Sequence, residues 1–324
     1  MPLKTPIAFC IFNRPALTAK VFESIRKVAP ERLLVIGDGP RAGNREDELR
    51  VRQSRAVLER IDWKCKLETN LSDKNLGCKS RMASGLTWAF EQSEELIILE
   101  DDCQPDPTFF SFCEQLLERY RHDDRVMMIS GNNFQPKSPH DSDPAQQQAA
   151  ESYYFSRWPH IWGWASWRRA WNHFDVNIES WPQTKQRGQL KDLFRSDEEY
   201  QHWASLFDQV HAGKIDTWDF SWAYAFWRNK GLSILPTSNL ISNLGFGPSA
   251  THTVDVNSKL ANLKTERIET IIHPDHVEPN LAADLYTWEN IISPPSPTRE
   301  IHNRPKWYRR LFGRSKPTSV PQSI

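Results

Sequence analysis

Three consecutive carboxylates, Glu100, Asp101 and Asp102, follow the apolar run 96–99. Such a run predicts a buried strand, and ligands bind beyond the carboxyl ends of the strands in open α/β sheets. Adjacent like charges repel one another unless a cation lies among them, and Mg²⁺ or Mn²⁺ prefers carboxylate oxygens and can bridge to phosphates. The triplet therefore predicts a divalent-cation site. The competing interpretation is an acidic turn that caps the following helix.

Two other residues near expected strand ends have types that suit a nucleotide. Asp38 lies between Gly37 and Gly39, whose small size lets a ligand approach the backbone. Its carboxylate could accept hydrogen bonds from a base or a ribose, and the alternative is a plain turn. Arg14 precedes Pro15 at an expected helix start, where a guanidinium suits a phosphate or the edge of a pyrimidine. The alternative for Arg14 is an ordinary surface arginine.

Two loops supply further candidates. Asn75 precedes a helix start that carries Arg81, which suits a diphosphate, although a turn and helix cap is the favoured interpretation. His252 follows the glycine-rich segment 245–248, and flexible loops of this kind often close over substrates. His252 is a candidate to ligate a metal or contact phosphate, but an exposed histidine more often does neither.

A carboxylate surrounded by aromatic residues is the candidate general base. Asp219 lies among Trp218, Phe220 and Trp222. Burial raises the pKa of a carboxyl group towards values useful for a base, and aromatic walls exclude water. Asp216 lies close by in the sequence and could fill the same role. The structural alternative is that Asp219 caps the helix that begins near it, and the pattern of the following residues favours this alternative.

The pattern of the first part of the chain predicts the elements that would position these residues. Strands are expected over 7–12, 33–36, 65–69, 96–99 and 126–130. Helices are expected between them, over 16–28, 45–60, 79–92 and 108–120. This alternation predicts an α/β fold with a doubly wound, mostly parallel sheet. Each of these strands except 65–69 ends in polar or glycine-rich residues, as a ligand site along one sheet edge requires.

Composition divides the chain into four segments. Residues 1–134 form the strand–helix half, 135–151 predict a mobile loop, and 152–293 form an aromatic-rich half packed on the first. Residues 294–324 are Pro-rich and then basic, with aromatic residues between the cations. This tail could contact an anionic membrane surface, and a merely solvated terminus is the alternative.

Composition also excludes some classes of protein. The 324 residues contain 41 Lys+Arg and 41 Asp+Glu, so a general nucleic-acid binder is not expected. Five scattered cysteines fit a reducing compartment, and neither a signal peptide nor a membrane span is evident. We therefore expect a cytoplasmic protein, which could contact the inner face of the membrane. The 14 tryptophans could hold sugar rings, although core packing is the favoured role for most.

Residues 96–110, which read LIILEDDCQPDPTFF, resemble the metal-binding segment of the N-acetylglucosaminyltransferase I family. Those enzymes have the GT-A fold, use a UDP-sugar and Mn²⁺, and invert the anomeric configuration. The resemblance extends to the segments 12–14, 37–39 and 86–92, and Trp162-Gly163-Trp164 and Trp218-Asp219 look similar to later landmarks of the family. Bacterial proteins with a hemolysin-type label look similar as well.

The resemblance implies a specific role for each matching residue. Asp102 would bind the metal, and Glu100 and Asp101 would contact the ribose or metal-bound water. Arg14 and Asp38 would hold the uracil, and Asp219 would be the base. Residues 1–134 would then bind the nucleotide-sugar, and 152–293 would face a glycan, lipid-linked or other hydroxyl acceptor. The family has two acidic residues in a row at the Asp219 position, whereas Phe220 follows here.

Two other functions stay open at the level of sequence. A nucleotidyltransferase that makes sugar nucleotides would share the α/β layout and acidic metal site, but it would need a glycine-rich loop where Asn13-Arg14-Pro15 stands. A non-catalytic carbohydrate-binding or membrane-active protein would account for the tryptophans and the tail. It would leave the acidic triplet unexplained.

Overall fold

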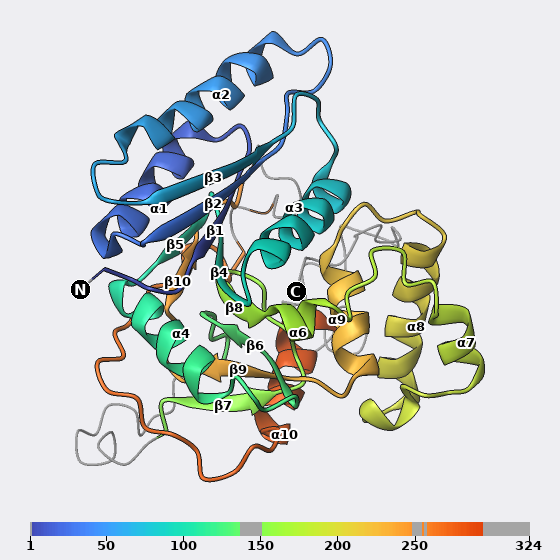
Figure 1. Ribbon diagram of the computed structural model, residues 1–324. Helices are drawn as coiled ribbons and strands as arrows, with labels where there is room; N and C mark the ends of the chain where they lie inside the picture. The colour runs from blue at the N-terminus through green and yellow to red at the C-terminus, as the bar shows by residue number, and fades with distance from the viewer. Residues whose placement is uncertain (1, 137–150, 248–254, 256–257, 294–324) are drawn as a thin grey trace, which may run out of the picture.

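A large mixed β-sheet forms the centre of the computed structural model, which describes residues 2–136, 151–247, 255 and 258–293 (Figure 1). Its eight strands lie in the order β3-β2-β1-β4-β8-β6-β9-β7. In chain order the strands are β1 (Ile7–Ile11), β2 (Arg32–Gly37), β3 (Lys66–Leu71), β4 (Glu95–Glu100), β6 (Val126–Ser130), β7 (Tyr153–Ser156), β8 (Trp164–Trp167) and β9 (Leu232–Pro236). Only β7 and β8 run against the other six, which confirms the predicted α/β class with a mostly parallel sheet.

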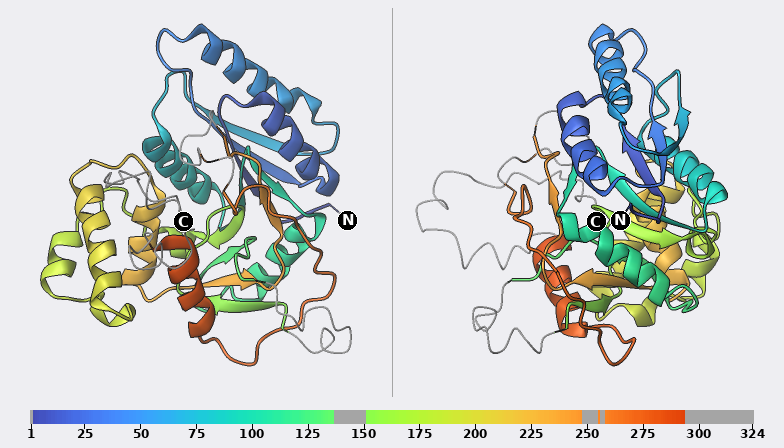
Figure 2. Two further views of the ribbon diagram at one scale, coloured as in Figure 1. Left: turned by 180° about the vertical axis from the view of Figure 1, so that it is seen from behind. Right: turned by 60° about the vertical axis from the view of Figure 1, so that its left-hand side comes forward.

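Helices cover both faces of the sheet, as a doubly wound fold requires. Figures 1 and 2 show α1 and α2 on one side of the sheet and α3 on the other. The helices of the first part are α1 (Pro15–Val28), α2 (Arg45–Ala56), α3 (Cys78–Gln92) and α4 (Pro107–Arg119). Each begins within one residue of its predicted start. The predicted helix 45–60 ends as a 3-10 turn over Val57–Arg60.

The α1 helix illustrates why these segments are helical. Pro15 occupies its first position, where the missing N–H costs nothing. Val21, Phe22 and Ile25 are fully buried and share one side of the helix. Ala29 ends the helix in a left-handed conformation, with φ of 44°. The chain then turns back into β2.

The second part of the chain contributes strands to the same sheet. β8 lies antiparallel between β4 and β6, with Ala165 opposite both Ile97 and Ile129. The sequence pattern did not predict β8, because the four residues 164–167 are buried on both faces and show no alternation. Strands 96–99 and 126–130 are therefore not direct neighbours in the sheet, although they run in the same direction.

The aromatic residues of the second part form core, as predicted for most of the tryptophans. Trp164, Trp171, Trp218 and Trp222 pack together with ring centroids 5.3 to 6.3 Å apart. All four are at most 4% exposed. Because Trp218 belongs to this cluster, the adjacent Asp219 is held against the rigid core.

The remaining elements complete the described part of the chain. They are the helices α6 (Arg168–Trp171), α7 (Trp181–Gln186), α8 (Asp197–His211), α9 (Asp219–Arg228) and α10 (Leu281–Thr287), two shorter turns, Lys191–Leu193 and Trp288–Ile292, and the paired strands β5 (Cys103–Pro105) and β10 (Ile241–Asn243). No helix in the described ranges is long and apolar enough to cross a membrane. His252, most of the predicted loop 135–151 and the whole tail 294–324 lie outside the described residues.

Candidate functional site

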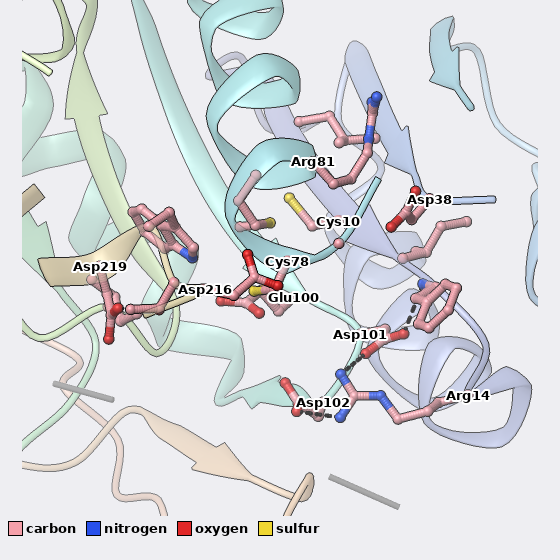
Figure 3. A pocket seen from close by; sticks show the side chains of 18 of the residues that line it. Cys10, Arg14, Asp38, Cys78, Arg81, Glu100, Asp101, Asp102, Asp216 and Asp219 are labelled. Atoms are coloured by element: carbon pink, nitrogen blue, oxygen red, sulfur yellow. Dashed lines mark hydrogen bonds and ion pairs between the residues drawn. The ribbon is translucent and has the colours of Figure 1, made fainter. Parts of the chain in front are cut away.

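A cavity of about 330 Å³ opens at the carboxyl ends of β1, β2 and β4. The start of α3 and the loop before α9 complete its walls. Figure 3 shows Asp216 and Asp219 on one side of this cavity, Asp38 and Arg81 on the other, and the acidic triplet between them. Its charged lining residues are Arg14, Asp38, Arg41, Arg81, Glu100, Asp101, Asp102, Asp216 and Asp219. With Asn75, which also lines it, the cavity collects the predicted site residues other than His252, which lies outside the described residues.

The acidic triplet does not cap the helix that follows it. Asp106 is the N-cap of α4, and its Oδ1 accepts hydrogen bonds from the Thr108 N–H at 2.8 Å and the Thr108 hydroxyl at 2.7 Å. Pro107 occupies the first helical position. The cap interpretation of the triplet is therefore wrong.

A single guanidinium bridges the last two acids of the triplet. Nη2 of Arg14 lies 2.6 Å from Oδ1 of Asp101, and its Nη1 lies 2.7 Å from Oδ2 of Asp102. The other oxygen of Asp101 accepts a hydrogen bond from the Phe12 N–H at 3.1 Å. Asp101 is thus fixed to the end of β1, whereas Asp102 lies at the edge of the cavity. The single positive charge of Arg14 therefore offsets only part of the negative charge of this pair.

Burial prevents the triplet from carrying its full charge. The pKa of Glu100 is raised to about 8, mainly by burial and then by the neighbouring Asp102. Burial also raises the pKa of Asp101 to about 6, although the Arg14 charge opposes the shift. A carboxyl group with a raised pKa in the folded state stabilises the fold below its unfolded pKa, and this contribution is lost as pH rises through the folded pKa.

We predict that replacing Glu100 by Gln flattens the dependence of stability on pH. In the native protein the free energy of unfolding should fall between about pH 4.5 and 8, the interval between the ordinary and the raised pKa of Glu100. Glu100→Gln removes the proton that Glu100 releases over this interval. Urea unfolding at several pH values measures the effect, and the exposed Glu59→Gln serves as a control. Equal slopes in both proteins would contradict a raised pKa at Glu100.

A glycine packs closely against Asp102. The Leu244 N–H donates to the Asp102 carbonyl at 2.8 Å, so the loop after β10 is tied to the triplet. A Cβ atom added to Gly245 would lie 2.0 Å from Oδ2 of Asp102 and 3.0 Å from Nη1 of Arg14. Only glycine therefore fits beside this ion pair.

We predict that Gly245→Ala displaces the Asp102 carboxylate. The added methyl group should destabilise the fold by about 1–3 kcal/mol, which is typical of overpacking a close contact. Thermal unfolding and a crystal structure of the variant measure both effects. Gly43→Ala is the control, because a Cβ at Gly43 meets nothing within 4 Å and only its positive φ of 74° opposes the change. A Gly245→Ala variant with an unmoved Asp102 and an unchanged melting temperature would contradict this packing.

At the far side of the cavity, the predicted nucleotide-binding residues also contact one another. Asp38 accepts hydrogen bonds from the Gly39 N–H, the Leu76 N–H and the Asn75 side chain at 2.8 to 2.9 Å. Nη2 of Arg81 donates to the backbone and side chain of Asn70, at 2.8 and 2.9 Å. The Asp38 bonds join the loops after β2 and β3, and the Arg81 bonds join α3 to β3. They fix the wall on which a ligand would lie.

Asp219 is the first residue of α9, and its N-cap is Trp218. Oδ1 of Asp219 accepts hydrogen bonds from the Thr217 hydroxyl and, at 3.0 Å, from the Phe220 N–H. The side chain is only 2% exposed yet belongs to the cavity wall. Asp216, in the loop before α9, lies beside the start of α3. Its Oδ2 would be 3.2 Å from a Cβ atom added to Gly77. Both candidate bases therefore face the cavity.

Carboxyl groups outnumber guanidinium groups in the described cavity wall by six to three. A diphosphate would bring further negative charge into this surrounding, so it would need a cation. Asp102 is the acid best placed for one, because both oxygens of Asp101 are already bound by Arg14 and the Phe12 N–H. No group of three His, Cys, Asp or Glu side chains that could hold a metal ion occurs within the described ranges. Mg²⁺ and Mn²⁺ sites of this kind take one or two carboxylates, and phosphate and water complete them.

The sequence did not single out Arg41, which lines the cavity, or Gly245, which packs against Asp102. Arg41 follows Gly39-Pro40, and its guanidinium is bound by Asp47. Gly245 was read only as part of a flexible loop. The position of Arg41, three residues after Asp38, could have indicated a second cation at the end of β2. The role of Gly245 depends on pairing between β10 and β5, which local sequence does not reveal.

No family model and no curated protein matches this chain. Among solved structures, a UDP-glucose pyrophosphorylase complexed with UDP-glucose is similar, with a TM-score of 0.35 and 9% sequence identity. The match covers 72% of this chain and 90% of that chain. The function of this chain therefore has to be inferred from its own residues.

Proposed function

We propose that this protein is a glycosyltransferase of GT-A type, which transfers a sugar from a nucleotide diphosphate sugar to a hydroxyl acceptor. The observation that carries the proposal is the Asp101–Asp102 pair at the end of β4, in one cavity with Asp38 on one side and Asp219 on the other. The first part of the chain would bind the nucleotide, and the loop before α9 would face the acceptor.

The resemblance to the N-acetylglucosaminyltransferase I family favours UDP as the nucleotide. Asp38 and Arg14 would contact the uracil, and Glu100 would contact the ribose. Glu100, protonated at neutral pH, can donate a hydrogen bond as well as accept one. Arg14 already contacts Asp101 and Asp102, so it would link the nucleotide to the end of the cavity where the diphosphate would leave.

Charge at the leaving group determines the first half of the mechanism. The bond between the anomeric carbon and the diphosphate oxygen breaks, and the diphosphate leaves with the bonding electron pair. A divalent cation, Mn²⁺ or Mg²⁺, held by Asp102 would neutralise this developing charge. Arg14 adds a second, permanent positive charge beside it.

Proton transfer at the acceptor determines the second half. The acceptor oxygen forms the new bond to the anomeric carbon, and the Asp219 carboxylate takes its proton. Asp219 lies across the cavity from Asp38 (Figure 3), and the family resemblance implies that the anomeric configuration would invert. Asp216 is the alternative base on the same wall.

We predict that Asp102→Asn weakens metal-dependent binding of UDP by at least about tenfold, which corresponds to 1.4 kcal/mol. The variant keeps the shape of the side chain and loses the charge that holds the cation. Calorimetric titration of UDP with and without Mn²⁺ measures the loss. The control is Asp124→Asn, whose side chain is 94% exposed. Unchanged affinity in Asp102→Asn would refute the proposed cation site, and preference for UTP over UDP would favour a nucleotidyltransferase.

We predict that Asp219→Asn lowers kcat by at least about 100-fold while the KM for the donor changes little, because a general base acts in the transition state. Release of UDP from a UDP-sugar, with water or a free sugar as acceptor, measures both constants. Asp216→Asn is the matched comparison. If Asp216→Asn loses activity and Asp219→Asn does not, the base is Asp216. If neither variant loses activity, neither residue is the base.

A further inference from the structure

One arginine of the cavity wall is held by a carboxylate that does not line the cavity. Arg41 is a lining residue, and its guanidinium binds Asp47 through two nitrogens, Nε on Oδ2 and Nη2 on Oδ1, the second at 2.8 Å. A planar guanidinium bound at two points has a fixed orientation. The side chain of Arg41 is still 58% exposed, whereas that of Asp47 is 4% exposed. A ligand in the cavity can therefore reach Arg41, and Asp47 holds it from the protein interior.

Two asparagines fix Asp47 in turn. The Asn13 side chain donates to Oδ1 of Asp47 at 2.7 Å, and the Asp47 N–H donates to Oδ1 of Asn44 at 3.0 Å. The bond from Arg41 is the largest cause of the lowered pKa of Asp47, about 2, so the carboxylate is ionised at neutral pH. An ion pair with an exposed partner adds little stability, so the main effect of these bonds is to fix the position of Arg41.

Arg41 lies between the ends of β1 and β2. It follows Asp38 by three residues, and Asn75, whose side chain binds Asp38, also donates its N–H to the Pro40 carbonyl at 3.3 Å. On the other side, the guanidinium carbon of Arg41 lies 5.8 Å from the centroid of the Phe12 ring, which lines the cavity as well. Because the proposed function places the nucleobase at Asp38, Arg41 belongs to the nucleoside end of the cavity.

The ion pair with Asp47 determines which part of a nucleotide Arg41 suits. The charge of Arg41 is offset by that of Asp47, so the pair adds no net positive charge with which to bind a diphosphate. The Nη1 group stays available, since it makes no hydrogen bond with the described residues. Its N–H groups are donors, and a carbonyl oxygen on an uncharged heteroaromatic ring is a matching acceptor. Arg41 therefore suits the nucleobase better than the diphosphate.

We propose that Arg41 donates a hydrogen bond from Nη1 to a carbonyl oxygen of the nucleobase, and that Asp47 is the positioning residue that orients it. The inference rests on the proposed function for the presence of a nucleotide in this cavity. Uracil carries two carbonyl oxygens and adenine carries none. Arg41 thus makes the site select UDP over ADP.

The test replaces Arg41 by Ala and measures binding by calorimetry with Mn²⁺. UDP should bind Arg41→Ala at least tenfold more weakly than it binds the native protein, and the preference for UDP over ADP should fall by a similar factor. Inorganic pyrophosphate, which has no base, should bind both proteins equally. The control is Arg50→Ala, because Arg50 is also paired with an acid, Glu46, on the same helix but does not line the cavity.

A double-mutant cycle tests the role of Asp47. Asp47→Asn should weaken binding of UDP at least threefold and leave that of pyrophosphate unchanged, a difference that a general loss of structure would not produce. The double variant should bind UDP no more weakly than Arg41→Ala alone, because Asp47 acts through Arg41. Additive losses would contradict the positioning role.

The outcomes separate this inference from the proposed function. Native affinity for UDP in Arg41→Ala, or an equal loss for UDP and pyrophosphate, would overturn the contact with the base while the proposed function stands. If the native protein binds no UDP in the presence of Mn²⁺, the proposed function fails and this inference fails with it.

Discussion

The repulsion among carboxylates gathered at the end of β4 is the constraint on which the rest of the site depends. Burial keeps Glu100 largely protonated and leaves Asp101 and Asp102 to share Arg14. The guanidinium can neutralise only part of this charge. A site built in this way favours an additional cation. An anionic ligand that brings a cation with it should therefore bind more tightly than the anion or the cation alone.

The second part of the chain completes the surroundings of these acids. The loop after β10 lies against Asp102, and the aromatic core fixes the turn that carries Asp219. Both contacts arise because the later strands join the sheet of the first part. The acids and the candidate base therefore belong to one rigid framework, in which a shift of the aromatic core would move Asp219 relative to the triplet.

Local sequence was sufficient for the first part of the fold and not for the second. The helices from α1 to α4 and the strands from β1 to β4 were predicted to within two residues at each end, except that α2 ends at Ala56 and not at residue 60. Breakers such as Pro15 and Gly37 mark several of these ends. β8 was missed because buried strands lack alternation. The polar strand ends after β1, β2 and β4 meet in the cavity as expected. The polar residues after β6 do not line it, and Asn132 is buried.

Sequence could also not reveal which acids are bound by the chain itself. Tertiary contacts determine that Asp106 caps a helix, that Asp47 binds Arg41 and that Asp101 accepts a hydrogen bond from Phe12.

The most direct test of the proposed cation site is the anomalous signal of manganese in crystals grown with UDP and Mn²⁺. We expect manganese bonded to a carboxylate oxygen of Asp102 and to the diphosphate. A diphosphate bound without manganese, with Arg14 still bridging Asp101 and Asp102, would contradict it.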